Sequence, residues 1–586
     1  MLMVSRSDEV REQVEKILAH ALFTRSERMG RFLRLAVGRS LEGRAGDLKE
    51  YLIGVEVFDR KESYDPRVDP IVRVEARRLR SKLKAYYAGD GSGDAVRIEF
   101  VPGSYAPQIR FADEGQARPP AAPGPPADPM TVAVLPFADL SSSPGHEYFS
   151  DGLTEELIHA LTKVPAMRVV AWNTAAQMRG WQQDLGAIRD RLHAGVALTG
   201  SVRIAGASLR VRAQLIDTET GVYLWSEAFD RTMQDVFAIQ EDIAQAIVRT
   251  LRVQLRAGPG EAPLARGRSS IGSYDLYLQG RYRWHKRTPE DLAGSVELFQ
   301  SAIAADPNSA LAYSGLADAY AVQVDYGLVS PAEGMPLAKS AASRAVELDP
   351  ELAEAYTSLA LIRSVYELEW DEAEKLYRRA MALNPGYATA HHWYAIDFCA
   401  MRGRFAEAEA NLGIAGQLDP LSNIIREGCA FLRLLQRDYE GAVRGYRELI
   451  ESSPAFYKAY TSLGRAYIQQ GRFLDAIAML EKGRTMAGDI PSILGAMGQV
   501  YALAGEASRA REVIGTIAEL ARRMYVPATV FAIVYIGLGE YEGALDWLEL
   551  GYERRDTPLV ALKVHPIYDP LRGLARFEAL LARMRL

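Results

Sequence analysis

The sequence has only two cysteines in 586 residues, Cys399 and Cys429. They have neither the spacing of a metal site nor the partners that a disulfide framework needs, so we expect a reducing compartment. The sequence also lacks any run of about 18 apolar residues, and charged residues near its start replace the apolar stretch of a signal peptide. These absences predict a cytoplasmic protein with no membrane partner.

The common catalytic motifs are absent as well. There is no Gly-Lys-Ser/Thr phosphate loop, no Gly-x-Ser-x-Gly elbow and no His-Glu-x-x-His helix. Four acidic residues of the middle region, Asp139, Asp151, Glu155 and Glu156, are expected to cap helices or to lie on solvated helix faces rather than to form a catalytic pair or a metal site. We therefore expect a protein that is not an enzyme, with no catalytic residues, no metal and no cofactor.

Charge and proline divide the chain into regions. The formal net charge is -6, yet residues 1–111 contain 21 Lys and Arg against 17 Asp and Glu, so only this region is basic. Residues 112–129 are rich in proline and alanine, which predicts a semi-extended linker. A weaker break at 256–270 separates a strand-rich region, 130–255, from a helical region, 271–586. The fold class expected is therefore multidomain.

The last region contains an internal repeat. A small residue recurs at spacings of 43, 35, 35, 34, 34, 34 and 34 residues. These positions are Ser295, Ala338, Ala373, Ala408, Ala442, Ala476, Ala510 and Ala544. A proline follows twelve residues after each of the first five, as expected where one helix closes and the next begins. The period predicts a stack of helix pairs.

One repeat, KAYTSLGRAYIQQGRFLDAIAMLEKG, resembles the tetratricopeptide (TPR) consensus. The resemblance implies an all-α solenoid of about eight repeats, with the ending HPIYDPLRGLARFEALLARMRL as a capping helix. Gly464 and Ala476 are then small because two helices approach closely. An array of this kind presents a concave surface to a protein or peptide partner. Exposed residues of a first repeat helix, Tyr457, Lys458 and Arg465, are the candidate contacts.

The basic region ends in a helix with two stripes, starting near Asp69. Its apolar residues Val72, Ala76, Leu79, Leu83 and Tyr86 step by 4, 3, 4 and 3 and share one face. A neighbouring stripe holds the cations Arg73, Arg77, Arg80 and Lys84. Such a helix packs by its first stripe and offers the second to a polyanion.

Two amphipathic helices precede this segment, and two alternating strands joined at Pro102-Gly103 follow it. The order resembles a winged helix-turn-helix of the OmpR DNA-binding type, in which 72–83 is the recognition helix and the hairpin ending in Gly103-Ser104-Tyr105 is the wing. A helix at 8–22 stands where that family has a strand sheet.

The resemblance implies a DNA-binding site on the basic stripe and the hairpin. Its candidate residues are Arg73, Arg77, Arg78 and Arg80 on the helix, Lys82 and Lys84 toward its end, and Arg97 on the hairpin. Three of them, Arg73, Arg77 and Arg80, are assigned to bases, and Lys82, Lys84 and Arg97 to phosphates. The alternative is that this stripe is only a solvated helix face.

The middle region combines a buried strand, TVAVLPF, with amphipathic helices and adjacent antiparallel strands. Its phrases AVLPF, YFSDGLTEELI, LTGSVR and QLIDTETGVYLWSE resemble the TolB N-terminal-like or FlgO-like α/β domain. This resemblance implies a fold and no chemistry.

Together the regions predict a transcriptional regulator that binds DNA by its N-terminal domain, with a homodimer possible, and a protein or peptide by its TPR array. The alternatives are a TPR scaffold that does not bind DNA and a regulatory subunit of an enzyme encoded elsewhere.

Overall fold

The computed structural model divides the chain into two compact units, Met1–Gly124 and Pro125–Leu586. It describes residues 6–24, 26–41, 48–58, 60, 64, 71–91, 93–100, 105–111, 128–141, 146–162, 164, 167–179, 184–206, 208–232, 238–239, 242–247, 250 and 270–586. The predicted linker therefore lies almost wholly outside the described residues. Among these residues no helix is both long enough and apolar enough to cross a membrane.

The first unit consists of helices followed by a hairpin. Its elements are α1 (Arg6–Ala19), α2 (Glu27–Leu41), α3 (Glu50–Phe58), α4 (Ile71–Ala88), β1 (Val96–Phe100) and β2 (Pro107–Phe111). Side chains of all four helices and of β1, among them Phe32, Phe58 and Ile98, form one buried core. The two strands pair antiparallel, with Val96 opposite Phe111. The helices and the strand pair thus follow the predicted order.

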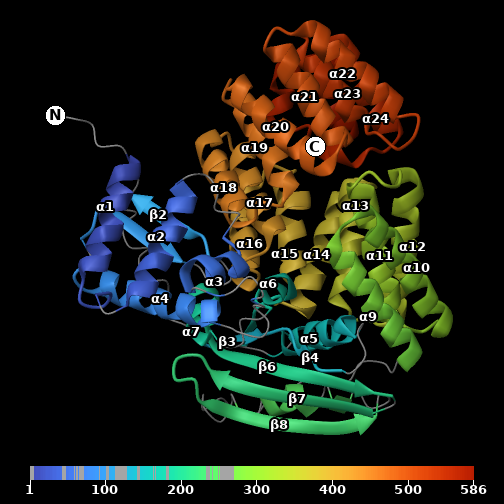
Figure 1. The fold of residues 1–586 in the computed structure, drawn as a ribbon. Coiled ribbons are helices and arrows are strands. Elements are labelled where there is room, and N and C mark those ends of the chain that lie inside the picture. The colour runs from blue at the N-terminus through green and yellow to red at the C-terminus, as the bar shows by residue number, and fades with distance from the viewer. Residues whose placement is uncertain are drawn as a thin grey trace. The chain divides into compact units, whose positions relative to one another are not determined.

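The second unit begins with a mixed sheet. Its elements are β3 (Asp128–Val134), β4 (Ala138–Asp139), α5 (Glu147–Thr162), β5 (Arg168–Val169), α6 (Trp172–Gln177), α7 (Leu185–Leu192), β6 (Ala194–Ala205), β7 (Ser208–Asp217) and β8 (Tyr223–Thr232). The strand order is β5-β3-β6-β7-β8, with β4 also on β6, and β6, β7 and β8 lie side by side and antiparallel (Figure 1). Alternate residues face opposite ways, so Val196 belongs to a core with Leu153 of α5 and Ala197 to another with Ile188 of α7.

Eight helix pairs span residues 271–553 and follow one another in sequence (Figure 1). The pairs are α9 (Ile271–Lys286) with α10 (Pro289–Ala305), α11 (Ala310–Asp325) with α12 (Pro331–Leu348), α13 (Ala353–Val365) with α14 (Trp370–Leu383), α15 (Ala388–Trp393) and the π-helix η4 (Tyr394–Ala400) with α16 (Phe405–Leu418), α17 (Asn423–Leu435) with α18 (Tyr439–Ser452), α19 (Tyr457–Gln469) with α20 (Phe473–Ala487), α21 (Pro491–Leu503) with α22 (Ala507–Leu520), and α23 (Ala528–Gly537) with α24 (Tyr541–Glu553). The short helices η5 (Thr557–Ala561) and η6 (Pro566–Leu571) and α25 (Ala575–Arg583) end the chain.

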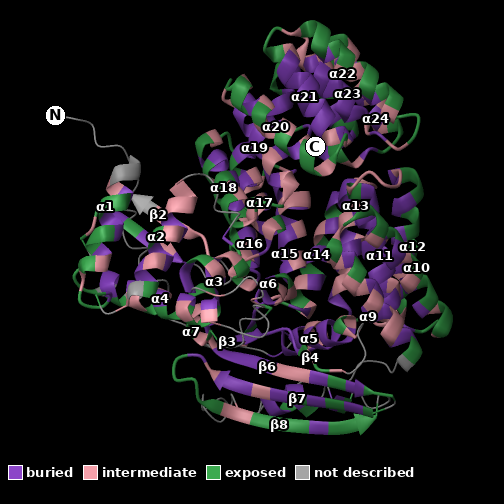
Figure 2. Cartoon of the chain, in the orientation of Figure 1, coloured by how far each residue is buried: buried purple, intermediate pink, exposed green. Residues whose placement is uncertain are grey.

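The repeated small residues explain the pairing. Each lies in the second helix of its pair and is completely buried. In the repeat that resembles the consensus, a Cβ added at Gly464 would lie 2.8 Å from Leu480 Cγ and 3.3 Å from the Ala476 carbonyl oxygen. Close helix approach therefore requires the small residue, and burial is concentrated on the facing sides of the helices (Figure 2).

Glycines between the two helices of a pair have a different role. Gly471 has φ of 72°, in the left-handed region that favours glycine. Gly413, in the interior of α16, has no atom within 4 Å of an added Cβ. We expect Gly471→Ala to lower the free energy of unfolding by about 1 kcal/mol and Gly413→Ala to raise it by about 0.5–1 kcal/mol. Urea titrations of the two variants check this, and a loss in both would contradict it.

The sheet and the repeats share one core. Side chains of the strands and of α5 cluster with Leu278 of α9, Phe299 of α10 and Leu316 of α11. The sequence break at 256–270 therefore separates two patterns of secondary structure but not two cores. The reason is that the first repeat buries its outer face against α5 instead of leaving it to solvent.

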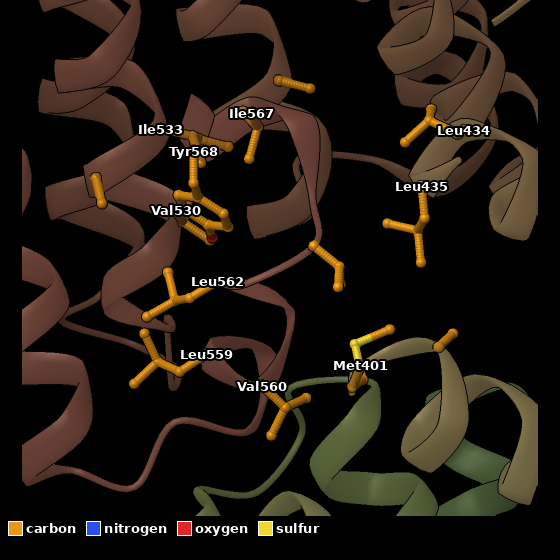
Figure 3. Packing of buried hydrophobic residues seen from close by; sticks show 14 of the residues in the cluster. Met401, Leu434, Leu435, Val530, Ile533, Leu559, Val560, Leu562, Ile567 and Tyr568 are labelled. Carbon is orange, nitrogen blue, oxygen red and sulfur yellow. The ribbon is translucent and has the colours of Figure 1, made fainter. Parts of the chain in front are cut away.

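The end of the chain reaches across the array. Arg576 of α25 forms ion pairs with Glu542, Asp546 and Glu549 of α24 at 2.7–2.8 Å, and the helix buries Phe577 and Leu580. Figure 3 shows apolar residues before this helix between α23 and the middle repeats. Leu559, Leu562 and Tyr568 lie on the side of Val530 and Ile533 of α23, whereas Val560 lies on the side of Met401.

Hydrogen bonds also join the end of the chain to the middle repeats. Arg437, after α17, donates to the Val564 carbonyl at 2.7 Å and to Asp569 at 2.7 Å. Trp370 Nε1 donates to the Met584 carbonyl at 3.2 Å. The terminal segment, residues 557–586, is thus more than a cap for its neighbour, because it joins repeats that are distant in sequence.

Candidate functional site

Helix α4 buries one face and exposes the next. Val72 and Leu79 have no exposed surface and Leu83 is 2% exposed, all in the core of the first unit. This is the face that the apolar spacing predicts. The core fixes the rotation of the helix, so the side of α4 that carries Arg77 and Arg78 faces outward.

The arginines of α4 are available to a polyanion. Arg77 is exposed and Arg80 half-buried, and within the described residues neither forms an ion pair. Arg73 pairs with Glu50 at 2.8 Å and Arg78 with Glu75 at 2.6 Å, while 55% and 66% of these arginine side chains stay exposed. The carboxylates are more covered, at 20% for Glu50 and 13% for Glu75, so a phosphate that binds these arginines has to share them with the carboxylates.

The remaining residues that were predicted to contact DNA differ in how exposed they are. Lys82 is half-buried, with Nζ 5.7 Å from the Phe23 ring centroid. The Lys84 side chain and the hairpin tip, residues 101–104, lie outside the described residues. Arg97 on β1 is 49% exposed, pairs with Glu99 at 2.7 Å and lies over the Tyr87 ring at 4.9 Å. It therefore adds a cation on the hairpin.

A hollow of about 720 Å³ runs beside α4. It is lined by Ser26, Met29, Val74, Glu75, Arg77, Arg78, Ser81 and Lys82. The lining therefore combines hydroxyl groups, cationic groups and the side chain of Val74, which is 41% exposed. Arginine, lysine and serine are typical donors to DNA phosphates and base edges, and apolar side chains contact thymine methyl groups.

The predicted groove residues of the array contact the chain itself. Tyr457, Lys458 and Arg465 were expected to be exposed, and all three are half-buried. Lys458 pairs with Asp325 at 3.5 Å and lies 4.2 Å from the Tyr326 ring centroid, while Arg465 donates to the Ser492 carbonyl at 3.0 Å. The expectation of free side chains is wrong: the array curves and brings the end of α11 beside Lys458 of α19, while Arg465 contacts the next repeat.

Asp397 on η4 lies in an environment that disfavours the charged form of its carboxyl group. Burial first, and then the charge of Asp325, raises the pKa of Asp397 to about 8. The group is therefore largely protonated in the folded chain at neutral pH. Folding takes up this proton, so the contribution of Asp397 to stability falls as pH rises from about 4, the unfolded value, to about 8.

Replacing the Asp397 carboxyl by an amide removes the free-energy cost of ionising this group in the folded chain. We expect Asp397→Asn to raise the free energy of unfolding by about 2 kcal/mol at pH 8 and by clearly less at pH 5. Thermal unfolding midpoints at the two pH values check this, with the exposed Asp371→Asn as control. An equal effect of Asp397→Asn at both pH values would contradict the assignment.

The sequence did not lead us to predict a buried ionic cluster on α5 and α9. Asp151 was expected to cap a helix and Glu155 to be solvated, yet Asp151 pairs with Arg179 at 2.6 Å and Glu155 with Arg281 at 2.5 Å. Burial raises the pKa of Glu155, but the charges of Arg281 and His285 outweigh it and leave this pKa well below its ordinary value. Asp151 and Glu155 are four residues apart on one helix, as are Arg281 and His285 on another, so each two share a helix face. This spacing was the sequence signal for the cluster.

Comparisons with known proteins give partial matches. No protein-family model matches the chain. It is 36% identical over 191 residues to the putative adenylate cyclase 3 of Rhizobium meliloti strain 1021, a match covering 33% of this chain and 32% of that protein. It is 24% identical over 305 residues to the transcriptional regulator HilA of Salmonella typhimurium LT2, covering 51% and 52%. The chain thus spans about a third and about half of these relatives.

Solved structures resemble parts of the chain. A tetratricopeptide repeat protein from Parabacteroides merdae ATCC 43184 is 18% identical, with a TM-score of 0.34 over 46% of this chain and 99% of that one. The human IFIT1 dimer with PPP-AAAA is 17% identical, with a TM-score of 0.40 over 57% and 79%. Likenesses at these TM-scores support no statement about what this chain binds. The helix pairs, their 34-residue period and the buried small residues define a TPR-type repeat array.

Proposed function

We propose that the chain is a transcriptional regulator whose first unit binds duplex DNA through α4 and the β1–β2 hairpin. The observation that supports this most strongly is the orientation of α4, which is fixed by its buried face and presents Arg77 to solvent beside the hollow. The 24% identity to a transcriptional regulator over half of the chain agrees with it. We assign Arg73, Arg77 and Arg80 to base edges or nearby phosphates.

The array is proposed to bind a protein or peptide, as TPR arrays do. Because Lys458 and Arg465 already contact the chain, they would engage a partner only by exchanging these contacts. A scaffold that does not bind DNA is the competing function, and the expectation that the chain is not an enzyme stays a prediction.

The DNA proposal predicts a loss of affinity on removing two arginines. We expect Arg77→Ala with Arg80→Ala to weaken binding of the full chain to duplex DNA at least about tenfold. The slope of log K against log salt should become shallower by about 2, since each lost phosphate contact removes about 0.9. Fluorescence anisotropy across salt concentrations measures both quantities.

A matched control comes from the array. Arg522 is 73% exposed and pairs with the 60% exposed Glu519 at 2.8 Å, and Arg523 beside it is exposed. Replacing Arg522 and Arg523 by alanine removes the same charge from a surface with no proposed DNA role. Equal losses in the two double variants, or no DNA binding by the unaltered chain, would favour the scaffold.

A further inference from the structure

A small cavity lies where the α/β part meets the first repeat. Its volume is about 230 Å³, and its walls come from α5, α6 and α9 together with Arg179. The aromatic rings of Tyr148, Trp172 and Tyr282 and the side chain of Leu278 line it. Gly152 closes it tightly, since an added Cβ would lie 2.5 Å from Leu278 Cδ2. The walls are therefore largely apolar and packed.

The carboxylates at this cavity are already neutralised. Both oxygens of Asp151 accept from Arg179 Nη2, at 2.6 and 2.7 Å. Glu155 Oε1 accepts from Arg281 Nη2 at 2.5 Å, and His285 Nε2 is 3.3 Å from either Glu155 oxygen. A ligand ammonium would therefore compete with cations that the chain itself supplies.

Cationic donors, by contrast, remain available. Arg179 uses one nitrogen for Asp151, and among the described residues its other nitrogens make no hydrogen bond. Lys286 lies 3.9 Å from its nearest carboxylate, Asp291, and 4.5 Å from the Tyr282 ring centroid. About half of each cationic side chain is exposed, 48% and 46%. The spare hydrogen-bonding capacity of the cavity is thus positive.

We propose that this cavity binds a small organic anion, a carboxylate on a flat apolar body, with Arg179 and Lys286 holding the carboxylate and the aromatic walls enclosing the body. An apolar pocket with a few convergent charged groups is the usual form of a ligand site. The volume is below the ~300 Å³ at which pockets for drug-sized ligands begin, so the ligand is about the size of one ring. Arginine suits this role because its planar fork matches a carboxylate.

The position of the site gives it a function beyond DNA binding. α5 belongs to the sheet region and α9 opens the repeat array, so a bound anion bridges the two parts of one core. A ligand that binds only the folded arrangement stabilises it by mass action. The site is therefore suited to an effector that stiffens this junction, whether or not the first unit binds DNA.

Benzoate is the probe for the test, with benzyl alcohol and benzylamine as neutral and cationic analogues of the same size. With the full chain, we expect saturation-transfer NMR and calorimetry to show benzoate binding at or below ~1 mM, since small ligands gain about 0.3–1.5 kcal/mol per heavy atom. The analogues should bind at least about tenfold more weakly. Benzylamine binding as tightly as benzoate, or no benzoate binding, would overturn the proposal.

Variants separate the site from adventitious binding. Lys286→Gln and Arg179→Gln should each weaken benzoate at least about tenfold. Ala176→Leu, which fills the cavity and keeps every charge, should abolish binding. Lys375→Gln, at a 74% exposed lysine of α14, is the control and should leave the affinity unchanged. Unchanged affinity in both Lys286→Gln and Ala176→Leu would overturn the proposal, since neither removes a partner of Asp151.

Discussion

Replacing Arg281 by methionine should lower the free energy of unfolding of the Pro125–Leu586 unit by about 3–5 kcal/mol. The guanidinium, 14% exposed, lies 2.5 Å from Glu155 and 3.4 Å from Asp318. Methionine fills a similar volume but leaves Asp318 without its cation, and Glu155 with only His285 beside it, inside a core. Breaking a buried pair from one side has this large cost because the desolvated partner stays behind.

The loss should also depend on pH. Burial raises the pKa of Asp318 to about 6, although the charge of Arg281 and the hydrogen bond from Ser358 lower it. Without Arg281 this pKa rises further, so Asp318 is neutral over more of the pH range. The destabilisation by Arg281→Met is therefore expected to be smaller at pH 5 than at pH 8.

Urea unfolding followed by fluorescence measures this loss, and a surface pair provides the control. Arg511, 60% exposed, pairs with Glu540 at 2.6 Å, and Arg511→Met should cost less than about 1 kcal/mol. The double variant Glu155→Gln with Arg281→Met should recover part of the stability, because one uncompensated carboxylate is removed. A loss in Arg281→Met no greater than in Arg511→Met would show that the cluster is not a buried ionic site.

Truncating Leu562 to alanine should cost about 2–5 kcal/mol. This side chain has no exposed surface and lies on the side of Val530 of α23, in the core that the terminal segment shares with the repeats (Figure 3). A cavity at this point loosens the terminal segment, and with it the hydrogen bonds that this segment accepts from Arg437 and Trp370 of repeats distant in sequence. Amide hydrogen exchange in α13 and α17 should speed up together with exchange in residues 557–586.

Leu474→Ala serves as the matched control, since Leu474 is 85% exposed and its truncation should change stability by less than about 0.5 kcal/mol. If Leu562→Ala released only the terminal segment while α13 and α17 kept their protection, the segment would be a peripheral cap. The closure of the array on itself would then contribute nothing to the middle repeats.

The repeat architecture could be read from the sequence because it is set by local spacing. The period of small residues fixes where two helices meet, and Gly464 and Gly471 each respond to contacts or dihedral angles within one repeat. The apolar stripe of α4 is predictable for the same reason, since Val72 and Leu79 lie on one helix face whatever surrounds them.

Contacts between distant segments could not be read in this way. Lys458 meets Asp325, and Trp370 meets Met584, because the curvature of the whole stack brings them together. No local spacing encodes that curvature. Glu155 of α5 pairs with Arg281, which lies on a different helix, α9. The sequence around Glu155 alone therefore predicted a solvated carboxylate.

Contact between the outer face of α4 and DNA is tested most directly by a photo-crosslink. Val74, on this face, is 41% exposed. With p-benzoylphenylalanine at Val74, illumination of the full chain with a pool of genomic duplex fragments should give a covalent protein–DNA product. The same group at Leu474 should give none. A missing product at Val74, or equal yields at the two positions, would contradict the account.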